Sequence, residues 1–155
     1  MGRRSVDDEL RSDVIVDIPK EQEHRFGCSG KMLKPSRASV EALVEKIPQG
    51  MVMTTPSLRK ALAERHNAQV TCPFLTKRAL MAIAEDPKTT VPFWRVVMAK
   101  GEMIAAYPGG GTEQARRLKT EGVMIAGRLG TYKVMNLRDL EMHSHALKVF
   151  SLSTV

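Results

Sequence analysis

Residues 55–86 read TPSLRKALAERHNAQVTCPFLTKRALMAIAED, and their pattern decides the fold of this chain. Thr55-Pro56 is typical of a helix start, because Thr caps a helix and Pro is tolerated at its first position. A turn follows over four polar or small residues, and a second helix begins around Cys72-Pro73. That second helix carries the adjacent cations Lys77 and Arg78. Two short helices joined by a turn, with cations on the second, predict a helix-turn-helix.

The segment before this stretch predicts another helix of the same domain. Ser36 is a good N-cap. Val40, Leu43, Val44 and Ile47 follow at i, i+3, i+4 and i+7, which places four apolar side chains on one helix face. We therefore expect a helix that starts after Ser36 and ends at Pro48 and Gly50.

The segment after this stretch predicts a helix and a hairpin. The helix is expected over residues 113–121, with Gly122 as its stop. Residues 123–125 (Val-Met-Ile) and 132–134 (Tyr-Lys-Val) flank a turn at residues 127–130 that contains two glycines, which indicates a hairpin. In a winged fold that hairpin is the wing. The expected fold class is mostly α with a small β-hairpin, in a winged helix-turn-helix-like domain.

The length of 155 residues fits one domain with a buried core. We expect that domain over residues 31–142. Residues 1–30 predict a polar, flexible N-terminal arm, and residues 143–155 form a C-terminal tail without a clear pattern. The chain lacks an apolar run long enough for a membrane span, and its N-terminus lacks the apolar core of a secretory signal. A cytoplasmic location is expected, in association with the nucleoid if the source is a prokaryote.

The charge is distributed unevenly along the chain. The whole sequence holds 24 basic and 17 acidic residues, for a net charge of +7. Residues 1–30 hold five basic and seven acidic residues, which leaves 19 basic and ten acidic residues in the remainder. A basic body with a slightly acidic arm suits a polyanionic partner such as nucleic acid. A solvated basic surface is the alternative interpretation of the same charge.

Residues 91–97 read VPFWRVV and resemble the Pro-Cys-His-Arg-Val active-site motif of the DNA alkyltransferases that repair alkylated guanine. Further matches follow the family's order between residues 36 and 123. They are IPQGMVMTT at 47–55, AIAEDP at 82–87, Gly101, YPGG at 107–110 and LKTEG at 118–122. The resemblance implies the DNA-binding domain of methylated-DNA–protein-cysteine methyltransferases.

Two residues of this motif differ from the family, and both stand where the family has its reactive side chains. Phe93 stands at the family's acceptor cysteine, and Trp94 at the histidine that helps to ionise it. A thiolate is the nucleophile in cysteine chemistry, and a phenyl ring cannot replace it. The resemblance therefore implies an alkyltransferase-like protein, which binds DNA without transferring an alkyl group, and we expect no catalytic residue. In the family, a glutamate lies beside this cysteine and histidine and completes a proton relay. Glu121 matches that glutamate, but Trp94 at the histidine position breaks the relay.

The resemblance also implies a lesion pocket formed by Pro92, Phe93, Trp94 and Tyr107. Aromatic rings in such a pocket can stack against a flipped base. The alternative is that Phe93 and Trp94 are core aromatics that fill space. Arg95 matches the motif's arginine, and we expect it to bond carbonyls or a carboxylate within the domain.

Binding of double-stranded DNA is expected through the second helix of the helix-turn-helix. The residues expected to contact DNA are Thr54, Thr55, Lys77, Arg78 and Lys88. The arginine with which the family fills the gap left by a flipped base falls on Lys77 or on the adjacent Arg78. The alternative is that Lys77 and Arg78 only make the surface of this helix soluble. The tyrosine with which the family rotates the phosphate during base flipping falls on Pro56, which has no hydroxyl. The sequence therefore supports duplex binding more firmly than base flipping.

Three functions remain open from the sequence. The first is recognition of alkylated guanine by a monomer that hands the lesion to nucleotide-excision repair proteins. The second is a DNA-binding regulator without lesion recognition. The third is an active methyltransferase that uses Cys72, whose thiolate a helix start would favour, with His66 nearby in the sequence. The pair His24 and Cys28 has no second pair to complete a metal site. We expect no metal and no cofactor.

Overall fold

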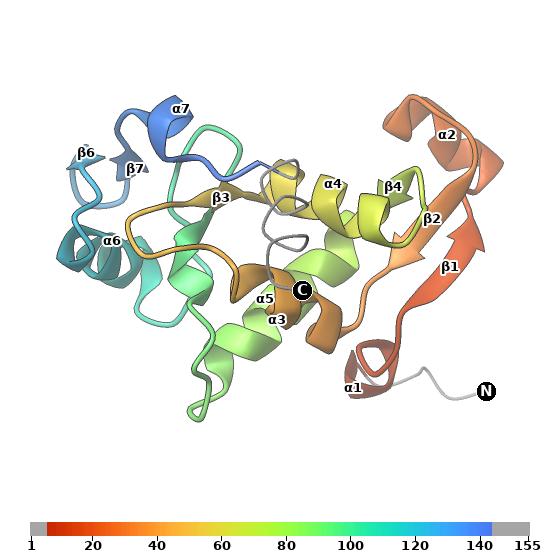
Figure 1. Cartoon of the computed structure of the whole chain (residues 1–155), viewed down its shortest axis with the longest axis horizontal. Helices are drawn as coiled ribbons and strands as arrows, with labels where there is room; N and C mark the ends of the chain where they lie inside the picture. The colour runs from red at the N-terminus through yellow and green to blue at the C-terminus, as the bar shows by residue number, and fades with distance from the viewer. Residues whose placement is uncertain (1–5, 144–155) are drawn as a thin grey trace, which may run out of the picture.

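The structure is a computed structural model that describes residues 6–143, and Figure 1 shows its arrangement. The helices are α1 (Val6–Glu9), α2 (Lys20–Phe26), α3 (Arg37–Val44), α4 (Thr55–Arg65), α5 (Pro73–Glu85), α6 (Gly110–Thr120) and α7 (Leu137–Leu140), with a 3₁₀ turn η1 (Phe93–Arg95). The strands are β1 (Val14–Asp17), β2 (Lys31–Lys34), β3 (Met53–Thr54), β4 (Val70–Thr71), β5 (Val96–Val97), β6 (Ile125–Ala126) and β7 (Lys133–Val134).

The main core lies between α3, α4 and α5, as their apolar spacing predicts. The expected stripe from Val40 to Ile47 is fully buried, although α3 ends at Val44 and Ile47 lies in the turn that follows. The inward residues of α4 and α5 pack against this stripe. Ser36 caps α3 by accepting a hydrogen bond from the Ser39 backbone N–H at 3.1 Å. α4 starts one residue earlier than expected, because Thr54 supplies the capping oxygen, which accepts from the Ser57 N–H at 3.3 Å.

The connection between α4 and α5 is more than a turn. Asn67 takes a left-handed backbone conformation with φ of 54° just after α4. The chain then forms the short strand β4, which pairs in parallel with β2 through Met32 opposite Val70 and Leu33 opposite Thr71. The residues of this connection therefore extend a sheet, and α5 begins directly after that strand.

The N-terminal segment differs from the loose arm that its polar composition predicts. Its described part, residues 6–30, contains α1, β1 and α2, and β1 pairs antiparallel with β2 from Val14 opposite Lys34 to Asp17 opposite Lys31. Leu10 and Ile18 are buried, so this segment contributes to the core. The β-branched run at residues 14–16 finds backbone partners in β2, and this pairing overrides the polar composition of the segment.

The C-terminal half forms a second, smaller apolar cluster. Two-residue strands β3 and β5 pair in parallel, and β6 pairs with β7 in the antiparallel hairpin that the sequence predicts. The hairpin lies beside α6 (Figure 1). Side chains from β5, α6 and β7 form this cluster, among them Val97, Leu118 and Val134. With three small sheets among residues 6–143, the fold is mixed α/β, and the expectation of a mostly α chain with one hairpin was too narrow.

Candidate nucleic-acid interface

The outer face of α5 combines cations with apolar side chains. Phe74, Lys77, Arg78 and Met81 recur at i, i+3, i+4 and i+7, on the face opposite the buried residues of this helix. Phe74 is 58% exposed, and the Arg78 guanidinium lies over its ring at 4.6 Å from the centroid. This face therefore presents one exposed aromatic ring together with two cations.

The two threonines expected to contact DNA lie in different environments. Thr54 is 3% exposed, and its hydroxyl lies within hydrogen-bond distance of the Glu141 carboxylate (3.1 Å) and of the Ser57 hydroxyl (3.0 Å). Its side chain is therefore committed to the cap of α4. Thr55 is partly exposed and lines a cleft next to α5.

Lys88 lies in the loop that follows the C-terminus of α5. Its side chain is exposed, and its backbone N–H donates to Asp86 Oδ1 at 2.9 Å. The other carboxylate oxygen of Asp86 accepts from Arg37 Nη2 at 2.7 Å. These bonds hold the end of α5 and the position of Lys88 against α3.

A cleft of about 440 Å³ opens between α4, the first half of α5 and the segment 104–107. This volume lies within the range of pockets that hold a small molecule. The lining residues are Thr55, Arg59, Pro73, Thr76, Lys77, Leu80, Met81, Met98, Ile104, Ala105, Ala106 and Tyr107. The walls are thus mostly apolar, with a few polar groups and two cations.

Three of the four expected lesion-pocket residues form one aromatic cluster. Phe93 makes edge-to-face contacts with Trp94, at 5.4 Å between centroids, and with Tyr107, at 5.1 Å. The Tyr107 hydroxyl donates to the Phe93 carbonyl at 3.2 Å. Burial raises the pKa of Tyr107 above its ordinary value. Pro92 and Phe93 are buried, and of the four residues Tyr107 is the one that lines the cleft.

Glu121 joins this cluster to the rest of the domain. Its carboxylate accepts from Trp94 Nε1 at 3.0 Å and from Arg95 Nη2 at 2.7 Å. Burial alone would raise the pKa of Glu121, but the hydrogen bonds from Arg95 and Trp94 hold that pKa below its usual value. Arg95 also donates to the Ile47 carbonyl at 2.7 Å, so its predicted role inside the domain is confirmed.

The position of Trp94 has a chemical consequence. Its indole N–H donates to a carboxylate oxygen of Glu121 at 3.0 Å. Indole nitrogen is a donor only and cannot take up a proton. This hydrogen bond therefore cannot pass a proton through Trp94.

Arg117 on α6 covers the outside of the aromatic cluster. Its guanidinium lies 4.9 Å from the Trp94 ring centroid and 5.4 Å from that of Phe93, and its Nε also pairs with Glu113 at 3.2 Å. The sequence does not predict this role of Arg117, because a cation 24 residues from Phe93 on another helix leaves no local signal.

Cys72 does not form the pair with His66 that an enzyme would need. The His66 ring lies 2.9 Å from the Leu62 carbonyl through Nδ1 and 3.2 Å from Asp13 through Nε2.

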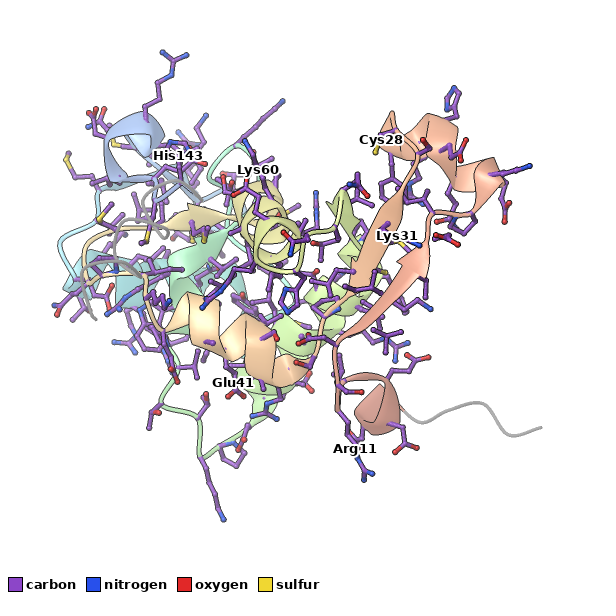
Figure 2. All side chains as sticks on the ribbon, turned by 45° about the vertical axis from the view of Figure 1, so that its right-hand side comes forward. Arg11, Cys28, Lys31, Glu41, Lys60 and His143 are labelled. Carbon is purple, nitrogen blue, oxygen red and sulfur yellow. The ribbon has the colours of Figure 1, made fainter. Side chains whose placement is uncertain are left out.

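Figure 2 shows Cys28 beside α2 and His143 beside α7, on opposite sides of the molecule. Within residues 6–143, no three His, Cys, Asp or Glu side chains gather as metal ligands could, and no helix is long and apolar enough to cross a membrane.

Arg59 is a further cleft residue, and the motifs of the sequence do not predict its place there. It lies one helical turn after Thr55, so the i, i+4 spacing places both on the same face of α4, which here borders the cleft. That spacing was a signal in the sequence, but nothing before the structure identified this face as one wall of a cleft.

Two solved structures that this chain resembles are of an S. pombe protein. The alkyltransferase-like protein Atl1 of S. pombe, in complex with damaged DNA containing O6-carboxymethylguanine, is 28% identical with a TM-score of 0.54. The match covers 68% of this chain and 93% of that one. This chain resembles an alkyltransferase-like protein in structure as well as in sequence. A second structure of the S. pombe protein in complex with DNA is 25% identical over the same shares, with a TM-score of 0.52.

These likenesses confirm the resemblance inferred from residues 36–123. No protein-family model matches the chain, and a comparison with curated proteins finds no match. The alkyltransferase-like resemblance therefore rests on the motifs and on the three-dimensional arrangement together.

Proposed function

We propose that this protein binds duplex DNA with the outer face of α5 and receives an alkylated base in the cleft beside that helix. No bond is made or broken in this mechanism. The observation that carries the proposal is that Lys77 and Met81 belong both to the outer face of α5 and to the cleft. A duplex held against α5 would therefore lie at the mouth of the cleft.

The likeness to Atl1 supports the same function, because both similar structures are complexes with DNA and one holds a damaged guanine. In this proposal α4 and α5 form the helix-turn-helix, with α5 as the recognition helix, and the β6–β7 hairpin is the wing. Alkylated guanine is the proposed lesion. A protein that only binds it needs a second factor to remove it, and we propose that this factor belongs to nucleotide-excision repair.

Lys77 and Arg78 provide the first test. We expect Lys77→Ala/Arg78→Ala to weaken duplex binding strongly and to lower the log–log salt slope by roughly 0.9 for each phosphate that the variant no longer neutralises. Fluorescence anisotropy with a labelled duplex at several salt concentrations measures both quantities. Lys20→Ala/Arg25→Ala is the matched control, because both cations are exposed on α2, far from α5 in Figure 1. Wild-type affinity in the α5 variant would contradict the assignment of the recognition helix.

The absence of alkyl transfer provides the second test. The intact mass of the protein should stay unchanged after incubation with an oligonucleotide that contains O6-methylguanine, because Phe93 has no nucleophile. Phe93→Cys should also fail to accept the alkyl group, since the Trp94 N–H can only donate. A stoichiometric mass gain on Cys72 in the wild-type protein would favour the methyltransferase alternative instead.

A DNA-binding regulator without lesion recognition remains the second candidate. The burial of Phe93 and the exposed Pro56 at the start of α4, which offers no hydroxyl, favour it. Equal affinity for a lesion-bearing duplex and an undamaged duplex of the same sequence would select this candidate.

A further inference from the structure

Arg59 is the half-buried cation of the cleft. It lies in the middle of α4, and its backbone carbonyl accepts from the Thr71 hydroxyl at 2.7 Å. No carboxylate among residues 6–143 forms an ion pair with its guanidinium. By contrast, Arg37 and Arg95 each pair with one or two carboxylates.

The cleft around Arg59 favours negative charge. Its twelve lining residues include two cations, Arg59 and Lys77, and no Asp or Glu. Burial lowers the pKa of Arg59 from its ordinary value, which is the sign of a cation that has lost water without gaining a counter-ion. An arginine remains charged under such a shift, so the site retains a cation that an anion can pair with.

The rest of the cleft wall suits a flat, mostly apolar ligand. Leu80, Met81, Ile104 and Tyr107 offer apolar surface. Arg59 lines this cleft and also a second hollow beside Glu64, and its guanidinium carries a planar fork of donors that matches a carboxylate in two parallel bonds. In surroundings of low polarity such a charge-assisted bond is stronger than in water. One ligand class combines both properties, namely a base that carries an acidic substituent.

We propose that Arg59 makes the cleft selective for alkylated bases whose adduct ends in a carboxylate, over neutral adducts of the same size. The inference rests on the proposed function, because it assumes that the damaged base enters this cleft. Arg59 acts as the specificity determinant, and the apolar wall holds the base. The alternative anion is a DNA phosphate, which shares the chemistry of an oxyanion but is present in every duplex.

The test compares four duplexes of one sequence. They carry a normal guanine, O6-methylguanine, O6-carboxymethylguanine, or its neutral amide analogue O6-carbamoylmethylguanine at one position. For the wild-type protein we expect the carboxymethyl duplex to bind about tenfold more tightly than the carbamoylmethyl duplex, the size of one hydrogen bond to a charged group. The two adducts have nearly the same shape, so this ratio isolates the charge.

Variants then test whether Arg59 causes the difference in affinity between the carboxymethyl and the carbamoylmethyl duplex. Arg59→Gln should reduce this ratio of affinities to about one, and Arg59→Lys should keep part of it, since the charge remains while the paired bonds are removed. Lys60→Gln is the matched control. Lys60 is the adjacent residue on α4, is exposed and does not line the cleft, so its removal should leave the ratio unchanged. Thermal melts check that each variant is folded, and the wild-type ratio stands as a test even if Arg59→Gln fails to fold.

The possible outcomes distinguish a failure of this inference from a failure of the proposed function on which it rests. If both adducts bind equally and more tightly than undamaged DNA, lesion recognition stands and the anionic class is overturned. If Arg59→Gln weakens binding to all four duplexes by one factor, Arg59 contacts a phosphate and the inference is wrong. If no lesion improves binding in the wild-type protein, both this inference and the proposed recognition of a lesion fail, whereas DNA binding by α5 is still decided by the Lys77 and Arg78 variants.

Discussion

The aromatic cluster and the cleft lie on two sides of Tyr107, yet their chemistry differs. In the cluster, Phe93 is 6% exposed, Trp94 is bonded to Glu121, and the charges of Arg95 and Arg117 are paired. In the cleft, the charge of Arg59 has no counter-ion among the described residues, and the walls are open to solvent. The position that holds the acceptor cysteine in alkyltransferases is therefore packed into the interior here, while the neighbouring cleft presents a cation without a counter-ion among the described residues.

Phe93→Ala tests the structural side of this comparison and should have the largest effect. Removal of a buried ring that contacts two other rings should lower the free energy of unfolding by about 3–5 kcal/mol. Urea or thermal unfolding measures the loss. Binding to damaged and to undamaged duplex should then decline together as the folded fraction falls. A stable variant that selectively loses lesion binding would show that Phe93 belongs to the pocket.

Glu121→Gln tests whether the cluster depends on its buried ion pair. The Arg95 and Glu121 side chains are 15% and 9% exposed, so loss of the carboxylate charge should cost about 3 kcal/mol of unfolding free energy. Because the pKa of Glu121 is lowered in the folded state, its contribution is complete above its ordinary pKa of 4.5. That contribution is lost as the pH falls through the lower folded-state pKa. Unfolding measured between pH 7 and pH 3 should therefore show wild type and variant converging at acid pH, and parallel curves would contradict the coupling.

Arg117→Met tests the cation that covers the cluster and should have a smaller effect. A cation over two aromatic rings at a partly exposed site should contribute about 1 kcal/mol to the free energy of unfolding. Arg116→Met is the matched control, because Arg116 pairs with the same carboxylate of Glu113 but contacts no ring among the described residues. Equal losses in the two variants would assign the effect to the ion pair, and the cluster would then need no cation.

Asp7→Asn addresses the binding side of the comparison and should have the smallest effect. Asp7 on α1 lines a surface hollow together with Lys77 and Arg78, so its charge opposes an approaching phosphate. Neutralisation should strengthen duplex binding by less than about threefold, since an exposed charge contributes well under 1 kcal/mol. Asp139→Asn on α7 is a control with the same change of net charge. The same increase in both variants would mean that only the total charge matters.

Much of the local structure was determined by the sequence alone. Ser36 as the cap of α3, the buried stripe from Val40 to Ile47, the inward face of α4 and the β6–β7 hairpin all follow from short-range periodicity and capping. The motif at residues 91–97 was likewise sufficient to identify the resemblance and the loss of the acceptor cysteine. These inferences succeed because each depends on residues within about two helical turns of one another.

Long-range contacts were decided only by the tertiary structure. The pairing of β1 with β2 and of β4 with β2 joins segments that share no local signal, so the N-terminal segment was expected to be loose. The same holds for the site. Arg117 covers the aromatic cluster from another helix, and Arg59 becomes a cleft residue only because α5 and segment 104–107 close the other walls. Whether a side chain is buried, paired or left facing a cavity depends on neighbours distant in sequence, which no local pattern specifies.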